Sequence, residues 1–141
     1  MELQYSELEM WQTFWIGMGA AGIWLAGVTF SIWVGFRLSG NIYSNPEASV
    51  VKRIAATGFC LCVAYFALVW FAMTEWHVNG AAGGFLDLKN SAQGLSPNGE
   101  MFLAAIDPRA SMSLLPNPFQ GFLLVCTSII QLMSIWMTKK L

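Results

Sequence analysis

The sequence predicts an all-α integral membrane protein with three transmembrane helices, and three observations support this fold class. First, three apolar runs contain no charged residue: 14–36, 54–73 and 119–137. At a rise of about 1.5 Å per residue, such helices are roughly 28 to 35 Å long, which matches the hydrocarbon core of a bilayer. Second, 56% of the residues are hydrophobic and only 11% are charged. Third, the charged residues gather between the runs. We expect residues 1–141 to form a single membrane domain.

The charges predict how the chain crosses the membrane. Sorted by side, one face carries five basic residues and one acidic residue, and the other carries two basic and seven acidic residues. The basic residues of the first face are Arg37, Lys52, Arg53, Lys139 and Lys140. Because Lys and Arg are retained on the cytoplasmic side, we expect the N-terminus outside and the C-terminus in the cytoplasm. Three crossings satisfy this arrangement.

We place the first span at about residues 11–36. The tail before it is acidic and lacks the basic start of a signal peptide, so we expect the span to remain in the mature protein. Ser6 and Glu9 have the spacing of a capping box. Small residues at Gly27, Ser31 and Gly35 recur every four positions and predict a helix-packing face. Tryptophans cluster near the ends of the spans, as expected of an aromatic belt.

We place the second span at about residues 53–76. Small residues again recur every four positions, at Ala56, Cys60, Ala64 and Ala72. In lipid no hydrophobic force drives helices together, so close backbone approach at small residues drives their association. We expect this face to pack against another helix, either of this chain or of another subunit. The opposite face, with Phe59 and Phe66, suits lipid or a large partner surface.

Residues 77–117 are expected to form a long outer loop. The segment 79–84 is rich in glycine and predicts a flexible connection, and the segment 90–97 is rich in turn-forming residues. Ser96 followed by Pro97 predicts the start of a short helix that runs through Phe102 toward Ile106. Its apolar residues predict that this helix lies at the membrane interface or against a partner.

We place the third span at about residues 118–138. Asn117 followed by Pro118 is a typical helix start, because Asn caps the helix and proline is tolerated in its first turn. Gln131 is the informative polar residue within the span. A primary amide at membrane depth is costly when unpaired, so we expect Gln131 to face another helix and to bond to it.

The sequence offers little catalytic chemistry. No apolar run contains an ionisable Asp, Glu, Lys, Arg or His, and proton relays or ion-coupled transport usually need such a group at depth. Cys60, Cys62 and Cys126 do not have metal-ligand or redox spacing. No phosphate-binding glycine loop and no basic patch for nucleic acid is present. We therefore predict no catalytic residue, no metal site and no nucleic-acid partner.

His77 is the one candidate cofactor ligand. It lies at the predicted outer end of the second span, between Trp76 and the outer loop. We expect it to make an interfacial hydrogen bond. The alternative is that it binds a metal, a haem or a chlorophyll, and such a site would need further ligands from other chains.

Three functions follow from these features, in order of preference. The first is a non-catalytic membrane subunit that packs against a larger energy-transducing, redox or transport complex. The second is a homo-oligomeric channel or scaffold, since neutral pores exist. The third is a cofactor-binding enzyme subunit that uses His77. In each case we expect bound membrane lipids, and the lack of an organellar leader favours a bacterial inner membrane.

Overall fold

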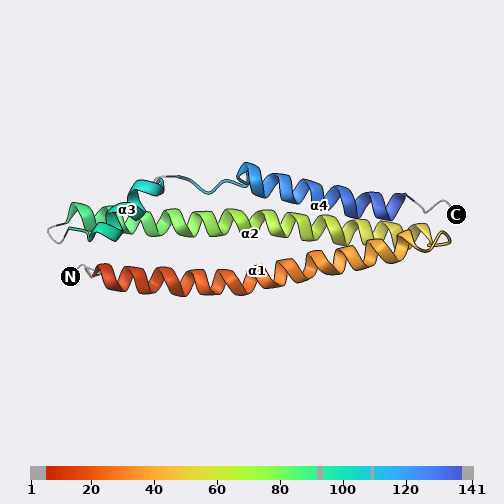
Figure 1. The fold of residues 1–141 in the computed structure, drawn as a ribbon, viewed down its shortest axis with the longest axis horizontal. Helices are drawn as coiled ribbons and strands as arrows, with labels where there is room; N and C mark the ends of the chain where they lie inside the picture. Colours follow the sequence, from red (N-terminus) through yellow and green to blue (C-terminus); the bar gives the residue numbers. More distant parts are fainter. Residues whose placement is uncertain (1–5, 92–93, 109, 138–141) are drawn as a thin grey trace. The chain divides into compact units, whose positions relative to one another are not determined.

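The computed structural model describes residues 6–91, 94–108 and 110–137, and it is all-helical over these residues (Figure 1). Its four helices are α1 (Glu7–Tyr43), α2 (Val50–Asn90), α3 (Pro97–Ala105) and α4 (Pro118–Trp136). Three of them, α1, α2 and α4, are long and apolar enough to cross a membrane. The three predicted spans are therefore confirmed as helices. Glu2, Arg109, Lys139 and Lys140, which entered the charge count, lie outside the described residues.

The two longest helices extend beyond the predicted spans. With 41 residues, α2 is roughly 60 Å long, about twice the thickness of a hydrocarbon core. It continues through the glycine-rich segment 79–84, where we expected a flexible connection. Asn79, Ala82, Phe85 and Leu88 recur every three residues and are buried. Packing of this face outweighs the low helix propensity of the glycines.

The helix starts follow the local signals in the sequence. Ser96 caps α3 and accepts a hydrogen bond from the Gly99 backbone N–H at 3.3 Å. Asn117 caps α4 and accepts from the Gln120 N–H at 2.9 Å. The Glu9 carboxylate accepts from the Ser6 backbone N–H at 2.7 Å, which completes the predicted capping box before α1. These three starts are confirmed.

The chain divides into two compact units rather than forming one cluster of contacts. The first unit comprises Met1–Ile23 and Ala72–Ser113, and the second comprises Trp24–Phe71 and Leu114–Leu141. The first unit thus contains the start of α1, the end of α2 and all of α3. The second contains the remainder of α1 and α2 together with α4. Each unit is described separately below.

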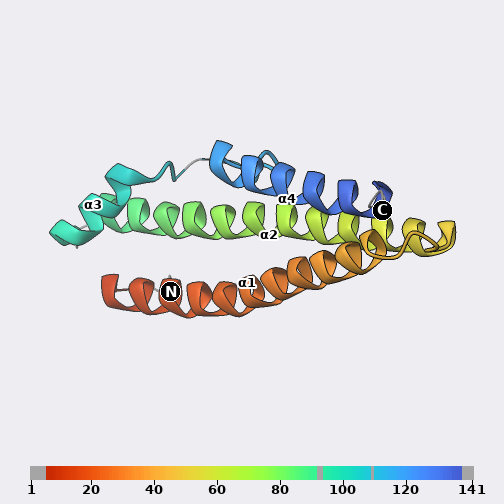
Figure 2. The same ribbon diagram turned by 45° about the vertical axis from the view of Figure 1, so that its right-hand side comes forward.

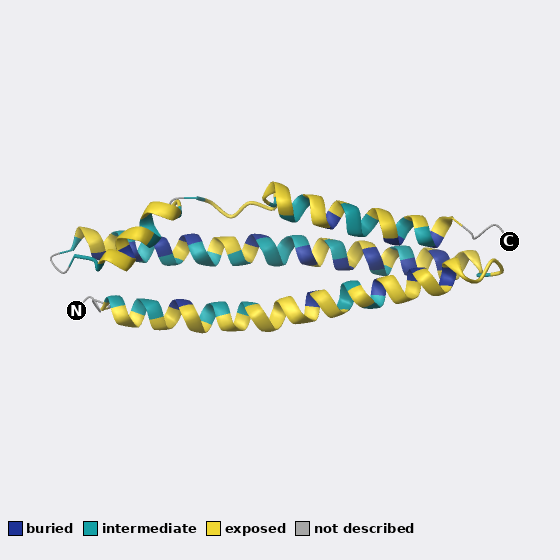
Figure 3. Cartoon of the chain, viewed as in Figure 1, coloured by how far each residue is buried: buried dark blue, intermediate teal, exposed yellow. Residues whose placement is uncertain are grey.

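In the second unit, α4 lies alongside the first half of α2, as Figures 1 and 2 both show. One buried cluster contains Val28, Ala67 and Leu124, one residue from each of the three long helices. A second contains Ile42, Ala56, Cys60 and Ile135. The long helices nevertheless remain exposed over much of their surface (Figure 3). A bilayer or other proteins would have to cover this apolar surface.

Candidate functional site

A groove of about 420 Å³ lies between α1 and α2 in the first unit. Its volume lies within the range of small-molecule sites. The lining is mostly apolar and includes His77, the candidate ligand identified from the sequence. The lining residues are Met10, Thr13, Phe14, Trp76, His77, Gly80, Ala81, Gly84 and Phe85.

His77 packs against α1 through its ring. The imidazole stacks on Phe14 with the ring centroids 6.2 Å apart and the planes within 7° of parallel. A Cβ placed on Gly17 would lie only 2.1 Å from His77 Nε2, so the imidazole occupies the space that glycine leaves open. Gly17 is therefore required for this approach of α1 and α2.

The geometry gives His77 no open metal-binding position at Nε2. That nitrogen is fully buried and has no hydrogen-bond partner among the described residues, so the expected interfacial hydrogen bond is not made through Nε2. Across residues 6–91, 94–108 and 110–137, no three His, Cys, Asp or Glu side chains gather as a metal site would require. Haem, chlorophyll or metal ligation by Nε2 would require the imidazole to leave Gly17.

Aromatic rings join the three helices of the first unit. Trp11 on α1 lies 4.7 Å from Phe85 on α2 and 5.3 Å from Phe102 on α3, measured between ring centroids. Phe14 contacts the same Phe102 ring edge-on at 5.3 Å. Such pairs add about 0.5 to 1.5 kcal/mol beyond the burial of their area. This aromatic cluster holds the short helix α3 against α1 and α2.

A polar link reinforces the same contact. The Glu7 carboxylate accepts hydrogen bonds from the Ser96 backbone N–H at 2.8 Å, the Ser96 hydroxyl at 2.5 Å and the Trp11 indole N–H at 3.1 Å. The hydroxyl and backbone donors of Ser96 lower the pKa of Glu7 below its usual value. The ionised carboxylate thus ties the start of α1 to the cap of α3.

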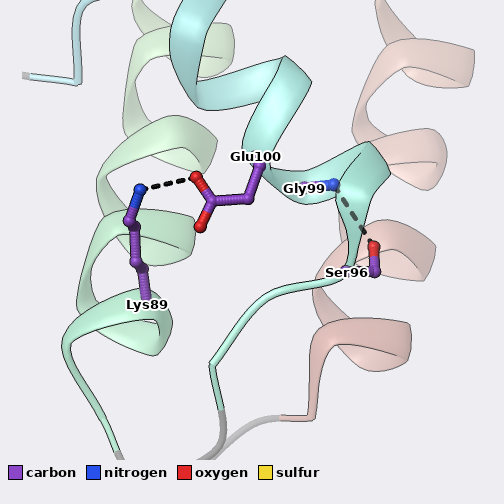
Figure 4. A network of polar contacts seen from close by, with 4 residues as sticks. All are labelled: Lys89, Ser96, Gly99 and Glu100. Carbon is purple, nitrogen blue, oxygen red and sulfur yellow. Dashed lines mark hydrogen bonds and ion pairs between the residues drawn. The ribbon is translucent and has the colours of Figure 1, made fainter.

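An ion pair adds a second polar contact to α3. Lys89 Nζ, near the end of α2, lies 2.5 Å from Glu100 Oε2 (Figure 4). Both side chains are almost half exposed, at 45% and 46%, so the pair stabilises the unit only weakly. Figure 4 also shows the Gly99 N–H donating to the Ser96 hydroxyl, which is the capping bond of α3.

In the second unit, three of the predicted packing residues come together. The Gln131 side chain of α4 is buried and donates a hydrogen bond to the Ile32 carbonyl oxygen of α1 at 3.0 Å. A Cβ on Gly35 would lie 2.6 Å from Gln131 Nε2 and 3.4 Å from Cys60 Sγ. Gly35 thus provides the space in which an amide from α4 reaches the backbone of α1.

The remaining predicted packing residues lie in different surroundings. Ala56 is buried beside Cys60, and Ala72 is buried in the first unit. Ala64 lines a shallow apolar groove of about 340 Å³ with residues of α4. Gly27 is exposed, with nothing within 4 Å of the position of a Cβ. Ser31 donates to the Gly27 carbonyl oxygen of its own helix at 2.9 Å.

The sequence did not reveal the structural part played by Arg53. Its guanidinium is buried and donates to the Ile135 carbonyl oxygen in the last turn of α4, and its Nε donates to the Ala48 carbonyl oxygen at 3.3 Å. The last carbonyls of a helix lack partners within the helix and attract cations. The distribution of charges along the sequence predicted that Arg53 and the end of α4 lie on the same side of the membrane. This was the only feature of the sequence that pointed to the contact.

Comparison with known proteins does not assign a function. No protein-family model, no curated protein sequence and no solved structure matches this chain.

Proposed function

We propose that the protein is a non-catalytic multi-pass membrane subunit that packs against other subunits of a larger energy-transducing, redox or transport complex. We further propose that its N-terminus faces the outside and its C-terminus the cytoplasm of a bacterial inner membrane. The charge asymmetry supports this orientation. The main support for complex formation is a contrast among the glycines of α1.

The glycines of α1 fall into two groups. Gly17 and Gly35 are filled by side chains of this chain, namely His77 and Gln131. Gly19, Gly22, Gly27 and Gly40 have nothing within 4 Å of the position of a Cβ. By helical periodicity Gly19 and Gly22 lie on the side of α1 that faces away from Gly17 and Gly35.

Uncovered glycines are unfavourable unless something packs on them. Each glycine in a helix costs about 0.5 to 1 kcal/mol relative to alanine, and lipid gains nothing from the missing side chain. A second helix does gain, because small residues allow close backbone contact. In addition, no more than 17% of the most apolar stretch of each long helix is buried within the chain. Both observations favour a partner helix on the Gly19–Gly22 face.

The test is to purify the tagged chain from its own membranes in mild detergent and to measure the mass of the intact assembly. Foreign subunits in defined stoichiometry support the proposal. Assemblies of identical copies alone would favour a homo-oligomeric channel or scaffold, and a bound metal or pigment would favour a cofactor subunit.

A matched pair of variants links the assembly to the glycine face. Gly22→Leu adds bulk to that face, and overpacking of close interfaces costs about 1 to 3 kcal/mol. The amount of partner subunits that copurify with the chain should therefore fall roughly tenfold or more. Gly22→Ala keeps the residue small and should retain them, as should Phe66→Leu on α2. Equal assembly of Gly22→Leu and Gly22→Ala would contradict the proposed interface.

The orientation is tested separately by cysteine labelling in a background that lacks Cys60, Cys62 and Cys126. Asn98→Cys and Glu47→Cys place single thiols at exposed positions in the two predicted polar regions. An impermeant reagent added to intact cells should label position 98 and not position 47. Labelling of position 47 alone would reverse the orientation.

A further inference from the structure

A second groove lies within the second unit, along the last turns of α1. It measures about 620 Å³ and is lined by residues between Trp33 and Ser44. The polar side chains Arg37, Asn41 and Ser44 follow Trp33 at intervals of four, four and three residues, so they share one face of the helix. The groove therefore changes from aromatic to polar along the helix axis.

The charge in this groove comes from Arg37. Arg37 is exposed and forms no ion pair with any residue that the structure describes. Glu47 is the only acidic residue between the first two spans, and it is not within ion-pair distance. The Arg37 guanidinium carbon instead lies 5.9 Å from the centroid of the Trp33 ring. This cation–π contact holds the guanidinium beside the groove.

The apolar part of the groove is also uncovered. Trp33 is 54% exposed, and Phe36 and Leu38 are exposed as well. Tryptophan and arginine side by side are typical of the boundary between hydrocarbon and headgroups, where an indole and a cation both find suitable surroundings. The groove thus presents an apolar wall, a cation and amide and hydroxyl groups in the order in which a phospholipid presents acyl chain, phosphate and headgroup.

We propose that this groove binds an anionic phospholipid, with the phosphate at Arg37 and an acyl chain along Trp33 and Phe36. Charge complementarity and the change from apolar to polar lining together favour a phospholipid. A soluble anion would use Arg37 but would leave the apolar wall uncovered. A basic residue near an anionic membrane surface contributes about 1 kcal/mol, which corresponds to about a fivefold change in affinity.

The test is native mass spectrometry of the purified chain with added phosphatidylglycerol or phosphatidylcholine of identical acyl chains. Arg37→Gln should reduce the phosphatidylglycerol adducts about fivefold and leave the phosphatidylcholine adducts unchanged. Lys52→Gln is the matched control, because it removes the same charge from the same unit but lies outside the groove. It should retain the adducts within twofold.

Three results would overturn the proposal. An equal loss of adducts in Arg37→Gln and Lys52→Gln would show a general effect of positive charge rather than a site. Displacement of phosphatidylglycerol by millimolar inorganic phosphate would show a site for soluble anions. Trp33→Leu, which retains Arg37, should also weaken binding of phosphatidylglycerol, and an unchanged affinity would exclude the apolar wall from the site. Thermal unfolding of each variant confirms that the fold is preserved.

Discussion

Different kinds of contact stabilise the interior of each of the two compact units. In the first unit, the rings of Trp11, Phe85 and Phe102 meet, and the Glu7 carboxylate binds the cap of α3. In the second unit, small residues allow the helices to approach, and Gln131 donates to a backbone carbonyl of a neighbouring helix. The first unit relies mainly on aromatic rings and a carboxylate, although Gly17 also makes room for His77. The second relies on small residues and on two side chains, Gln131 and Arg53, that donate to backbone carbonyls.

The two kinds of contact depend differently on the surrounding solvent. Burial of aromatic area stabilises a protein only against water, whereas in lipid close packing and hydrogen bonds between helices remain. The predictions below test this contrast, from the largest expected effect to the smallest.

Gly35→Leu should destabilise the second unit most. A side chain at position 35 must displace Gln131 and press on Cys60, which are 2.6 and 3.4 Å from the site of a Cβ. Overpacking together with a lost buried hydrogen bond costs about 2 to 4 kcal/mol. The measurement uses a background without Cys62 and Cys126, so that Cys60 is the only cysteine. With Gly35→Leu, the buried Cys60 thiol should react with a thiol reagent at a lower temperature than with glycine at position 35. Gly27→Leu is the control and should leave the unfolding temperature of the isolated chain unchanged.

Gly17→Ala should destabilise the first unit by about 1 to 2 kcal/mol, because even a methyl group collides with the His77 ring. Gly19→Ala, two residues later, adds the same group in open space and should be neutral or slightly stabilising. His77→Ala combined with Gly17→Ala should recover part of the loss. Thermal unfolding of the parent, Gly17→Ala, Gly19→Ala, His77→Ala and the double variant measures this coupling. Equal behaviour of Gly17→Ala and Gly19→Ala would contradict the packing of His77.

Gln131→Leu should cost only about 0.5 to 1 kcal/mol. The variant loses one bond between helices, but the Ile32 carbonyl oxygen retains its bond within α1 and the volume is nearly conserved. Ser134→Ala is the control, since its hydroxyl donates only to the Ile130 carbonyl oxygen of its own helix. A loss as large as that of Gly35→Leu would mean that the amide, rather than the close backbone approach, holds α4.

Glu7→Gln should have the smallest effect and should act on the first unit alone. Ser96 lowers the pKa of Glu7 from its usual value of 4.5 in the folded chain. The ionised carboxylate therefore stabilises the fold above about pH 4.5, and this contribution is lost as the pH falls through the lower folded value. Because solvent screens the carboxylate, we expect less than about 1 kcal/mol.

The measurement is thermal unfolding of the parent and of Glu7→Gln between pH 6 and pH 3. The parent should lose stability on acidification, and the variant should lose less. Glu47→Gln in the second unit is the control and should follow the parent. Identical pH dependence in the parent and in Glu7→Gln would show that the Glu7 to Ser96 contact contributes nothing.

The sequence was most informative where the signal was local. Apolar length predicted α1, α2 and α4, and cap residues predicted the starts of α3 and α4. It was least informative at the end of α2, where the glycines of 79–84 suggested a flexible segment. There the helix is held by its buried face, which includes Phe85, and the partner rings lie on α1 and α3.

The candidate sites show the same division. The sequence singled out His77, Gly35 and Gln131, but it could not show that His77 meets Gly17 or that Gln131 meets Gly35. Nor could it distinguish the filled glycines of α1 from the open ones at Gly22 and Gly27. All these glycines look alike in a hydropathy pattern, because the pattern records composition and spacing but no neighbours.

By itself, then, the sequence determined the class of protein, the three helices that can span a membrane and where α3 and α4 begin. These properties depend on residues within one or two turns of each other. Only the tertiary structure decided which glycines receive a side chain, that Glu7 binds Ser96 at a separation of 89 residues, and that Arg53 reaches the end of α4 at a separation of 82. Such contacts form between segments that the chain brings together only on folding, so no local pattern encodes them.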